Sequence, residues 1–160
     1  MNIFVLDRDP VVAAQMQCDR HVVKMVLESA QMLSTAVNLL GGEARYKTAH
    51  VNHPCSVWAR QSLGNFLWLY SHGMALAKEY TERYGKRHKS EEVIQDCMYE
   101  VRPLPLYNFK RTPHPLCMPD EYKTDDVVQS YRAYYLGDKV RFAQWNKTRT
   151  APQWWAQGGE

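Results

Sequence analysis

The stretch from Asp19 to Gly42 constrains the fold of this chain more than any other part of the sequence. Its apolar residues recur at helical spacing on three adjoining faces, and the pair Gly41-Gly42 is a typical helix stop. A helix that is apolar nearly all round is buried, so we predict a central helix, capped by Asp19. Only one stripe is consistently polar, with the three- and four-residue spacing of a single helix face: His21, Lys24, Glu28, Gln31 and Thr35.

Four further helical segments are predicted around the central helix. Asp9-Pro10 is typical of a helix cap and first turn, while residues 2–6 favour an extended segment. Five prolines between residues 102 and 120 indicate a long irregular loop, and the tail from residue 146 is expected to be irregular. The expected helices are residues 10–17, 52–84 with a break at Gly64, 91–100 after a Ser90 cap, and 125–145 with a break at Gly137.

The composition agrees with a folded globular domain. The chain has 160 residues, of which 45% are hydrophobic and 23% charged, and this length suits one domain with a sizeable core. No apolar run approaches the ~20 residues that span a bilayer, and residues 1–9 carry acids where a secretion signal needs bases. We therefore expect a mostly α, single compact helical domain over residues 1–160, with a long proline-rich loop, in the cytoplasm and without membrane contact.

The cysteines and histidines raise the question of a metal site. Cys18 and His21 form one pair at CxxH spacing, and His53 and Cys55 form another at HxC spacing, so together they could supply four zinc ligands. The alternative is two buried thiols near unrelated histidines. Neither spacing is the usual one for paired ligands, so we expect reduced thiols, no metal and no cofactor.

Two polar clusters are candidates for chemistry. His21, Lys24 and Glu28 offer an imidazole, an amine and a carboxylate on one helix face, although Lys24 and Glu28 are also spaced for a simple ion pair. His50, Asn52 and His53 precede a helix start, where backbone N–H groups suit an anion or where a side chain caps the helix. The sequence leaves both alternatives open at each cluster.

The chain is mildly basic, with a formal net charge of +3, which permits contact with nucleic acid. It contains no Gly-rich phosphate or dinucleotide motif and no nucleophile elbow, which disfavours ATP-dependent and NAD-type chemistry. Basic side chains beside aromatic residues suggest phosphate contacts and base stacking, while solvated charges beside core aromatic rings are the alternative. We predict DNA contacts at His53, Arg60, Lys86, Arg87, Lys89 and Arg132.

Two short motifs resemble a known family. The run Asp19-Arg20-His21-Val22-Val23-Lys24, followed by Glu28 and Gln31, resembles the early helix of the pyrimidine-dimer DNA glycosylases, the phage endonuclease V type and its bacterial relatives. Asn52-His53-Pro54, with Trp58 about one turn later, resembles a second segment of those relatives. The resemblance covers roughly residues 1–85, and the segment 131–135 is more weakly similar to the aromatic C-terminal part of the family.

The resemblance implies an all-helical, one-domain enzyme that acts on DNA bases without a metal. In that family the N-terminal α-amine attacks the sugar C1′, and a glutamate of the early helix supports the reaction. This chain differs at two points. It begins Met1-Asn2, where the family has a processed small residue, and the position that aligns with the glutamate lies closest to His21, two turns before Glu28.

These observations lead to one main hypothesis and two alternatives. The main hypothesis is a metal-independent DNA glycosylase or glycosylase/AP lyase for a damaged or modified base, in the host cytoplasm if the protein is phage-encoded. Glu28 would stabilise positive charge, His21 would handle protons, Lys24 or the N-terminal amine would be the nucleophile, and the target base would leave the stack. The alternatives are a non-catalytic nucleic-acid or nucleotide-binding protein, such as an accessory or inhibitor, and an enzyme acting on free nucleotides.

Overall fold

The computed structural model describes residues 1–158 and confirms the mostly α fold. No strand occurs within these residues. The α-helices are α1 (Pro10–Met16), α2 (Asp19–Leu39), α3 (Pro54–Ala59), α4 (Leu63–Tyr84), α5 (Glu91–Val101), α6 (Val127–Tyr134) and α7 (Gln153–Gly158). A 3-10 turn at Asp120–Tyr122 precedes α6, and a π turn at Tyr135–Lys139 follows it. No helix within the described residues is both long and apolar enough to cross a membrane.

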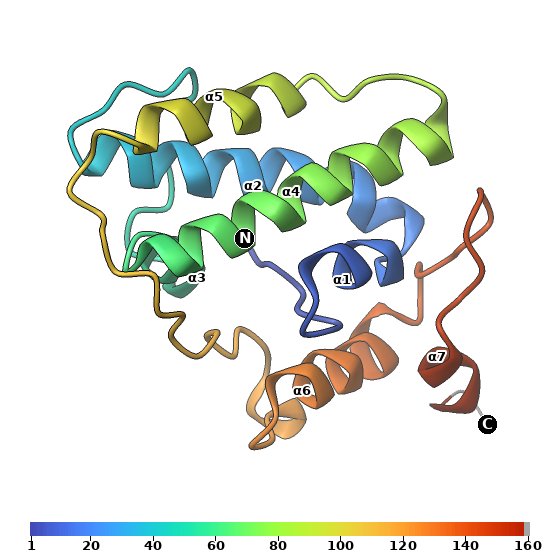
Figure 1. The fold of residues 1–160 in the computed structure, drawn as a ribbon. Coiled ribbons are helices and arrows are strands. Elements are labelled where there is room, and N and C mark those ends of the chain that lie inside the picture. Colours follow the sequence, from blue (N-terminus) through green and yellow to red (C-terminus); the bar gives the residue numbers. More distant parts are fainter. Residues whose placement is uncertain (159–160) are drawn as a thin grey trace.

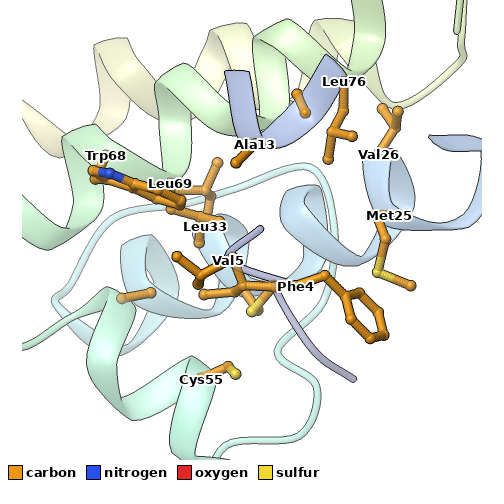
Figure 2. Close-up of a cluster of buried hydrophobic side chains, with 14 of the residues drawn as sticks. Phe4, Val5, Ala13, Met25, Val26, Leu33, Cys55, Trp68, Leu69 and Leu76 are labelled. Atoms are coloured by element: carbon orange, nitrogen blue, oxygen red, sulfur yellow. The ribbon is translucent and has the colours of Figure 1, made fainter. Parts of the chain in front are cut away.

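The central helix α2 packs against α3, α4 and α5, and α1 packs against α4 (Figure 1). The extended N-terminal segment runs through the interior beside these helices, where Ile3, Val5 and Leu6 are at most 2% exposed. Figure 2 shows Val5 among the core side chains, near Leu33 of α2 and Leu69 of α4. The predicted extended segment at residues 2–6 is thus part of the core, and it fixes where the chain's first residues lie.

A buried ionic network joins α1, α2 and α4. The Arg83 guanidinium donates to the Gln17 carbonyl oxygen at 2.7 Å and contacts the carboxylates of Asp19 and Glu79 at 3.1 and 3.0 Å. Arg149, from the C-terminal segment, also pairs with Glu79. The expectation that Asp19 caps α2 was wrong, because Asp19 is the first helical residue and its carboxylate serves this network instead.

The expected break in the 52–84 region lies slightly earlier than Gly64. α3 ends at Ala59, and Ser62 caps α4 by accepting a hydrogen bond from the Asn65 N–H group. Gly64 lies in the first turn of α4, where an added Cβ would collide with the carbonyl group of Phe109 in the proline-rich loop. The glycine therefore permits a close approach of the loop and does not break the helix.

The C-terminal part differs more from the prediction. The expected helix from 125 to 145 is shorter, because regular α6 ends at Tyr134 and the π turn ends at Lys139. The tail that was predicted to be irregular contains α7 instead. Trp145, Trp154 and Trp155 surround the fully buried Tyr135, so burial of aromatic surface orders a segment whose local sequence gives no helical signal.

The surface of α2 is also not as predicted. Val23 and Leu27 were assigned to an apolar core face, but they are 38% and 40% exposed. His21 and Glu28, from the polar stripe, are buried instead. The outward strip of α2 therefore combines Val23 and Leu27 with exposed cationic side chains, and the buried carboxylate of Glu28 needs partners inside the protein.

Candidate active site at the N-terminus

The buried carboxylate of Glu28 lies against the start of the chain. The Met1 α-amine is 3.3 Å from Glu28 Oε1, and the Asn2 backbone N–H group donates to the same oxygen at 3.2 Å. Lys24 Nζ is 3.6 Å from Glu28 Oε2, and its side chain is 65% exposed, against 8% for Glu28. One carboxylate thus has a buried amine on one oxygen and a solvent-facing amine near the other.

The second oxygen of Glu28 keeps accepting capacity. Oε2 is buried and accepts no hydrogen bond from any described residue, since the Lys24 ammonium lies beyond hydrogen-bonding distance. A buried carboxylate oxygen is rarely left without a partner. Its nearest cation is the Lys24 ammonium, with which it forms an ion pair at 3.6 Å.

The position of the first residues is set by contacts from distant parts of the chain. The Asn2 side-chain amide donates to the Cys117 carbonyl oxygen at 2.8 Å, and the Tyr131 hydroxyl donates to Asn2 Oδ1 at 2.8 Å. Cys117 belongs to the proline-rich loop and Tyr131 to α6. These contacts, which sequence reasoning missed, anchor the residue next to the α-amine and so hold that amine at Glu28.

His53 joins this site from the start of α3. Its Nδ1 accepts a hydrogen bond from the Cys55 N–H group at 3.1 Å, so His53 caps the helix. Burial, and then the charge of the nearby α-amine, lower the His53 pKa. His53 is therefore a neutral, half-buried ring beside the α-amine.

His21 lies elsewhere on α2, in an aromatic cluster. Its ring stacks on Phe4 with centroids 4.2 Å apart, and its Nδ1 is 2.6 Å from the Tyr135 hydroxyl oxygen. Burial lowers the pKa of His21 to about 3, which keeps the ring neutral near pH 7. The residue that meets the α-amine is Glu28 and not His21.

Three cationic side chains lie near His21, and one of them, Lys24, also reaches Glu28. Arg20 and Lys24 are exposed on the outward strip of α2, and the Lys139 ammonium lies 4.4 Å from the Tyr134 ring centroid. All three cations help to lower the pKa of His21, after the larger effect of burial. The outward strip of α2 is thus positively charged next to the α-amine.

The basic loop at residues 86–89 lies on the other side of the same strip. His88 Nε2 is 3.0 Å from the Val23 carbonyl oxygen, which places the loop against α2. Lys86 and Lys89 are exposed. Arg87 is also exposed, but it forms ion pairs with Glu91 and Glu92. Of the three predicted DNA contacts in this loop, the two lysines therefore have the freer charges.

The structure gives other surroundings to the remaining residues that were expected to contact DNA. Arg132 donates to the Leu6 carbonyl oxygen at 2.9 Å and pairs with Asp7 at 3.5 Å, so it fastens the N-terminal segment. Arg60 ends α3 and is half-buried. Tyr131 and Tyr135, considered for base stacking, are fully buried core residues.

The cysteines do not assemble into the four-ligand zinc arrangement considered from the sequence. Cys18 contacts the Tyr135 hydroxyl, whereas Cys55 Sγ lies 3.6 Å from Cys117 Sγ. The Cys55 contact lowers the pKa of the Cys117 thiol to about 7, and the same contact raises the pKa of Cys55. No local sequence signal joins two cysteines that are 62 residues apart.

Comparison with known proteins gives one match. A family model described as pyrimidine dimer DNA glycosylase matches residues 1–92. No curated protein and no solved structure matches the chain. The matched residues include Met1, Glu28 and His53 and run from the N-terminal segment into the start of α5, so they contain the amine–carboxylate pair but not the loop and α6 that anchor Asn2.

Proposed function

This chain belongs to the pyrimidine dimer DNA glycosylase family, and we propose that it is a DNA glycosylase with AP lyase activity whose nucleophile is the N-terminal α-amine. The observation that best supports the proposal is the 3.3 Å approach of the Met1 α-amine to the buried carboxylate of Glu28. The Asn2 nitrogen lies 3.2 Å from the same oxygen. An amine exposed by removal of Met1 would therefore start from the same place.

The proposed reaction begins with the neutral α-nitrogen. Its lone pair forms a bond to C1′ of the target nucleotide while the bond between C1′ and the base breaks. The base leaves with the bonding electrons and takes up a proton. Loss of a proton from the nitrogen and opening of the sugar ring give a protonated imine, and removal of a C2′ proton then expels the 3′ phosphate, which is the lyase step.

Glu28 would stabilise the positive charge that this reaction develops. Its Oε1 is already next to the nucleophile, and its Oε2 accepts no hydrogen bond from the described residues. A fixed carboxylate that is 8% exposed acts in a medium of low polarity, where it stabilises a nearby cation more strongly than it would in water. The chemistry of an amine nucleophile paired with a carboxylate requires no metal.

Lys24 is the competing nucleophile, and we assign it a supporting role. Its side chain is 65% exposed and its ammonium is 3.6 Å from Glu28 Oε2, whereas the α-amine lies 3.3 Å from Glu28 Oε1 and the Met1 side chain is 2% exposed. Lys24 is better placed to contact a phosphate at the edge of the site. His21, which is neutral and packed against aromatic rings, would shape this region and not carry protons.

We further propose that DNA lies across the outward strip of α2. Lys24 lies beside Glu28, the partner of the α-amine, Arg20 is exposed one turn before Lys24 on α2, and the loop that carries Lys86 and Lys89 lies against Val23. Contacts between such cations and phosphates position a duplex without reading its sequence. The exposed apolar side chains of Val23 and Leu27 would then face the DNA between the two cationic groups, next to a nucleotide that must leave the stack.

Borohydride trapping tests this function. Incubation of the protein with a duplex that carries an abasic site, in the presence of borohydride, should reduce the imine to a stable amine and give a covalent protein–DNA adduct. The control is an undamaged duplex, which has neither an abasic site nor a damaged base. Binding without an adduct would favour the non-catalytic nucleic-acid-binding alternative, and action on free nucleotides alone would favour the third hypothesis.

A further inference from the structure

We propose that His53, Cys55 and Cys117 form a binding site for one soft divalent cation, such as Zn²⁺ or Cd²⁺. One ligand atom from each residue lies within 4.8 Å of the other two. Two thiols and an imidazole form a donor set that binds such soft cations in preference to harder ions. Neither the family relationship nor the proposed reaction calls for a metal here.

The two sulfur atoms already have the spacing of metal ligands. Cys55 Sγ and Cys117 Sγ are 3.6 Å apart, and two thiolates at about 2.3 Å from a tetrahedral Zn²⁺ lie about 3.8 Å from each other. The pair therefore requires little movement to hold an ion. The His53 nitrogen is farther away, within 4.8 Å, and a shift of about 1 Å by its ring completes a trigonal face.

The state of the His53 ring also suits a ligand. Its Nδ1 accepts a hydrogen bond from the Cys55 N–H group, so the neutral ring has its proton on Nε2, and the Nδ1 lone pair would exchange this capping hydrogen bond for the cation when the ring shifts. His53 and Cys117 are both partly exposed, which gives an ion a path from solvent.

Binding is balanced by proton release. The cation replaces two thiol protons, one from Cys55 and one from Cys117, while the neutral imidazole binds through its lone pair. Three protein ligands leave a fourth position for water, which is the arrangement of an open site. Two other cysteines serve as internal controls, because Cys18 contacts Tyr135 and Cys97 contacts Ser34, each without a second thiol.

Cd²⁺ titration of the reduced protein tests the site directly. The full chain, kept reduced with a phosphine, should bind one Cd²⁺ per chain by equilibrium dialysis and show an ultraviolet thiolate-to-metal charge-transfer band. Cys117→Ala should weaken binding by more than the roughly 10–100-fold that loss of a second-shell partner causes. The matched control Cys97→Ala should bind like the wild type, and Zn²⁺ should compete for the same site.

Three results would overturn the proposal. The first is that the reduced wild type binds no stoichiometric Cd²⁺. The second is that Cys117→Ala binds Cd²⁺ with wild-type affinity. The third is that the Cys97→Ala control loses as much Cd²⁺ affinity as Cys117→Ala. Cys117 is half-exposed, so its variant should fold, and the melting temperature of each metal-free variant verifies this. Zn²⁺ should also raise the melting temperature of the wild type and not that of Cys117→Ala.

The proposed cation site lies near the N-terminus, so an ion bound there should affect the proposed reaction. The side-chain amide of Asn2, the residue next to the α-amine, donates to the Cys117 carbonyl oxygen at 2.8 Å, so a bound cation would be close to the nucleophile. We expect Zn²⁺ to inhibit adduct formation by the wild type and not by Cys117→Ala. This expectation rests on the proposed function, whereas Cd²⁺ binding does not, so failure of one leaves the other measurable.

Discussion

At the scale of single residues, the main feature is a buried carboxylate between two amines. Glu28 is 8% exposed, and the Met1 α-amine and Lys24 approach its two oxygens from the protein side and the solvent side. In a structural ion pair the carboxylate would mainly hold the N-terminus in place. In the proposed enzyme it also stabilises charge that appears only during the reaction.

Glu28→Gln separates these two roles. Gln keeps the shape and can still accept hydrogen bonds from the first residues, but it carries no negative charge beside a developing cation. We expect the variant to melt within a few degrees of the wild type and to lose adduct formation by about 100-fold or more. A large drop in melting temperature with normal trapping kinetics in the folded fraction would show that Glu28 is structural only.

Two buried histidines, His21 and His72, and the partly buried His114 predict how stability changes with acidity. Burial lowers the pKa of His21 and His114 to about 3 and that of His72 to about 4, against about 6.5 in an unfolded chain. The unfolded chain therefore binds more protons below pH 6.5, so acid favours unfolding. Each histidine should remove up to about 1.4 kcal/mol of stability per pH unit between pH 6.5 and about pH 4.

Thermal melting at several pH values checks this expectation. The melting temperature should fall as the pH decreases from 7 to 5, a range in which most carboxylates are still ionised. His21→Gln removes one of the three groups, so its stability should depend less steeply on pH than that of the wild type. If stability depends on pH equally steeply in the variant and the wild type, His21 takes up a proton as readily in the folded protein as in the unfolded chain.

Single residues also show how far the sequence could be interpreted. Glu28 and His53 were identified because each lies in a local pattern, a helix stripe and a helix start. Their partners could not be found in this way, because the Asn2–Tyr131 and Cys55–Cys117 contacts span 129 and 62 residues. His21 was given a catalytic role because its spacing matches the stripe, and spacing does not show that Phe4 and Tyr135 enclose the ring.

At the scale of elements, some helix ends with local chemical signals were predicted correctly. Asp9 caps α1 through hydrogen bonds from the Val11 and Val12 N–H groups, and Gly85 ends α4 with φ of 73°, a conformation that favours glycine. The predicted Ser90 cap was wrong, because its side chain makes no capping hydrogen bond to α5 and lies 2.8 Å from the Tyr46 hydroxyl instead. The π turn after α6 and the helix α7 were missed. Both depend on packing around Tyr135, which no local pattern specifies.

α2 itself offers a matched test of which residues face the core. Val26 and Leu33 are fully buried, whereas Leu27 is 40% exposed on the outward strip. Val26→Asp or Leu33→Asp places an unpaired charge in the core and should unfold the protein. Leu27→Asp, on the same helix, should leave the melting temperature within a few degrees. A folded Val26→Asp variant with wild-type melting would show that the buried face has been assigned wrongly.

The loop at residues 86–89 offers a test of the proposed DNA face. Lys86→Glu combined with Lys89→Glu should weaken DNA binding. The slope of log K against log salt concentration should become less steep by about 1 to 2. This pair avoids Arg87, whose ion pairs with Glu91 and Glu92 would complicate the result.

Lys110→Glu is the matched control for that pair. Lys110 is exposed in the proline-rich loop, and its neighbour Asn108 bonds to Gly64 at the first turn of α4. The basic loop follows the other end of this 22-residue helix, roughly 30 Å away. If the double variant keeps the wild-type salt slope, or if Lys110→Glu lowers it equally, the basic loop is not part of the DNA contact.

At the scale of the whole molecule, the fold brings the first residue of the chain to the central helix. The N-terminal segment is buried among α2, α3 and α4, and α6 and the proline-rich loop fasten Asn2 from the other side. Mostly α structure and a buried central helix could be predicted from apolar periodicity. The arrangement that places an α-amine at Glu28 could not, because it depends on the path of an extended segment through the core.

The most direct measurement of the central claim is the identity of the nitrogen that joins the DNA. The adduct trapped by borohydride on abasic DNA is digested with a protease and a nuclease, and its attachment site is identified by mass spectrometry. We predict attachment at the α-nitrogen of the N-terminal residue, with the adduct retained in Lys24→Ala. Attachment at Lys24 Nζ, or at any other side chain, would contradict the assignment of the α-amine as the nucleophile.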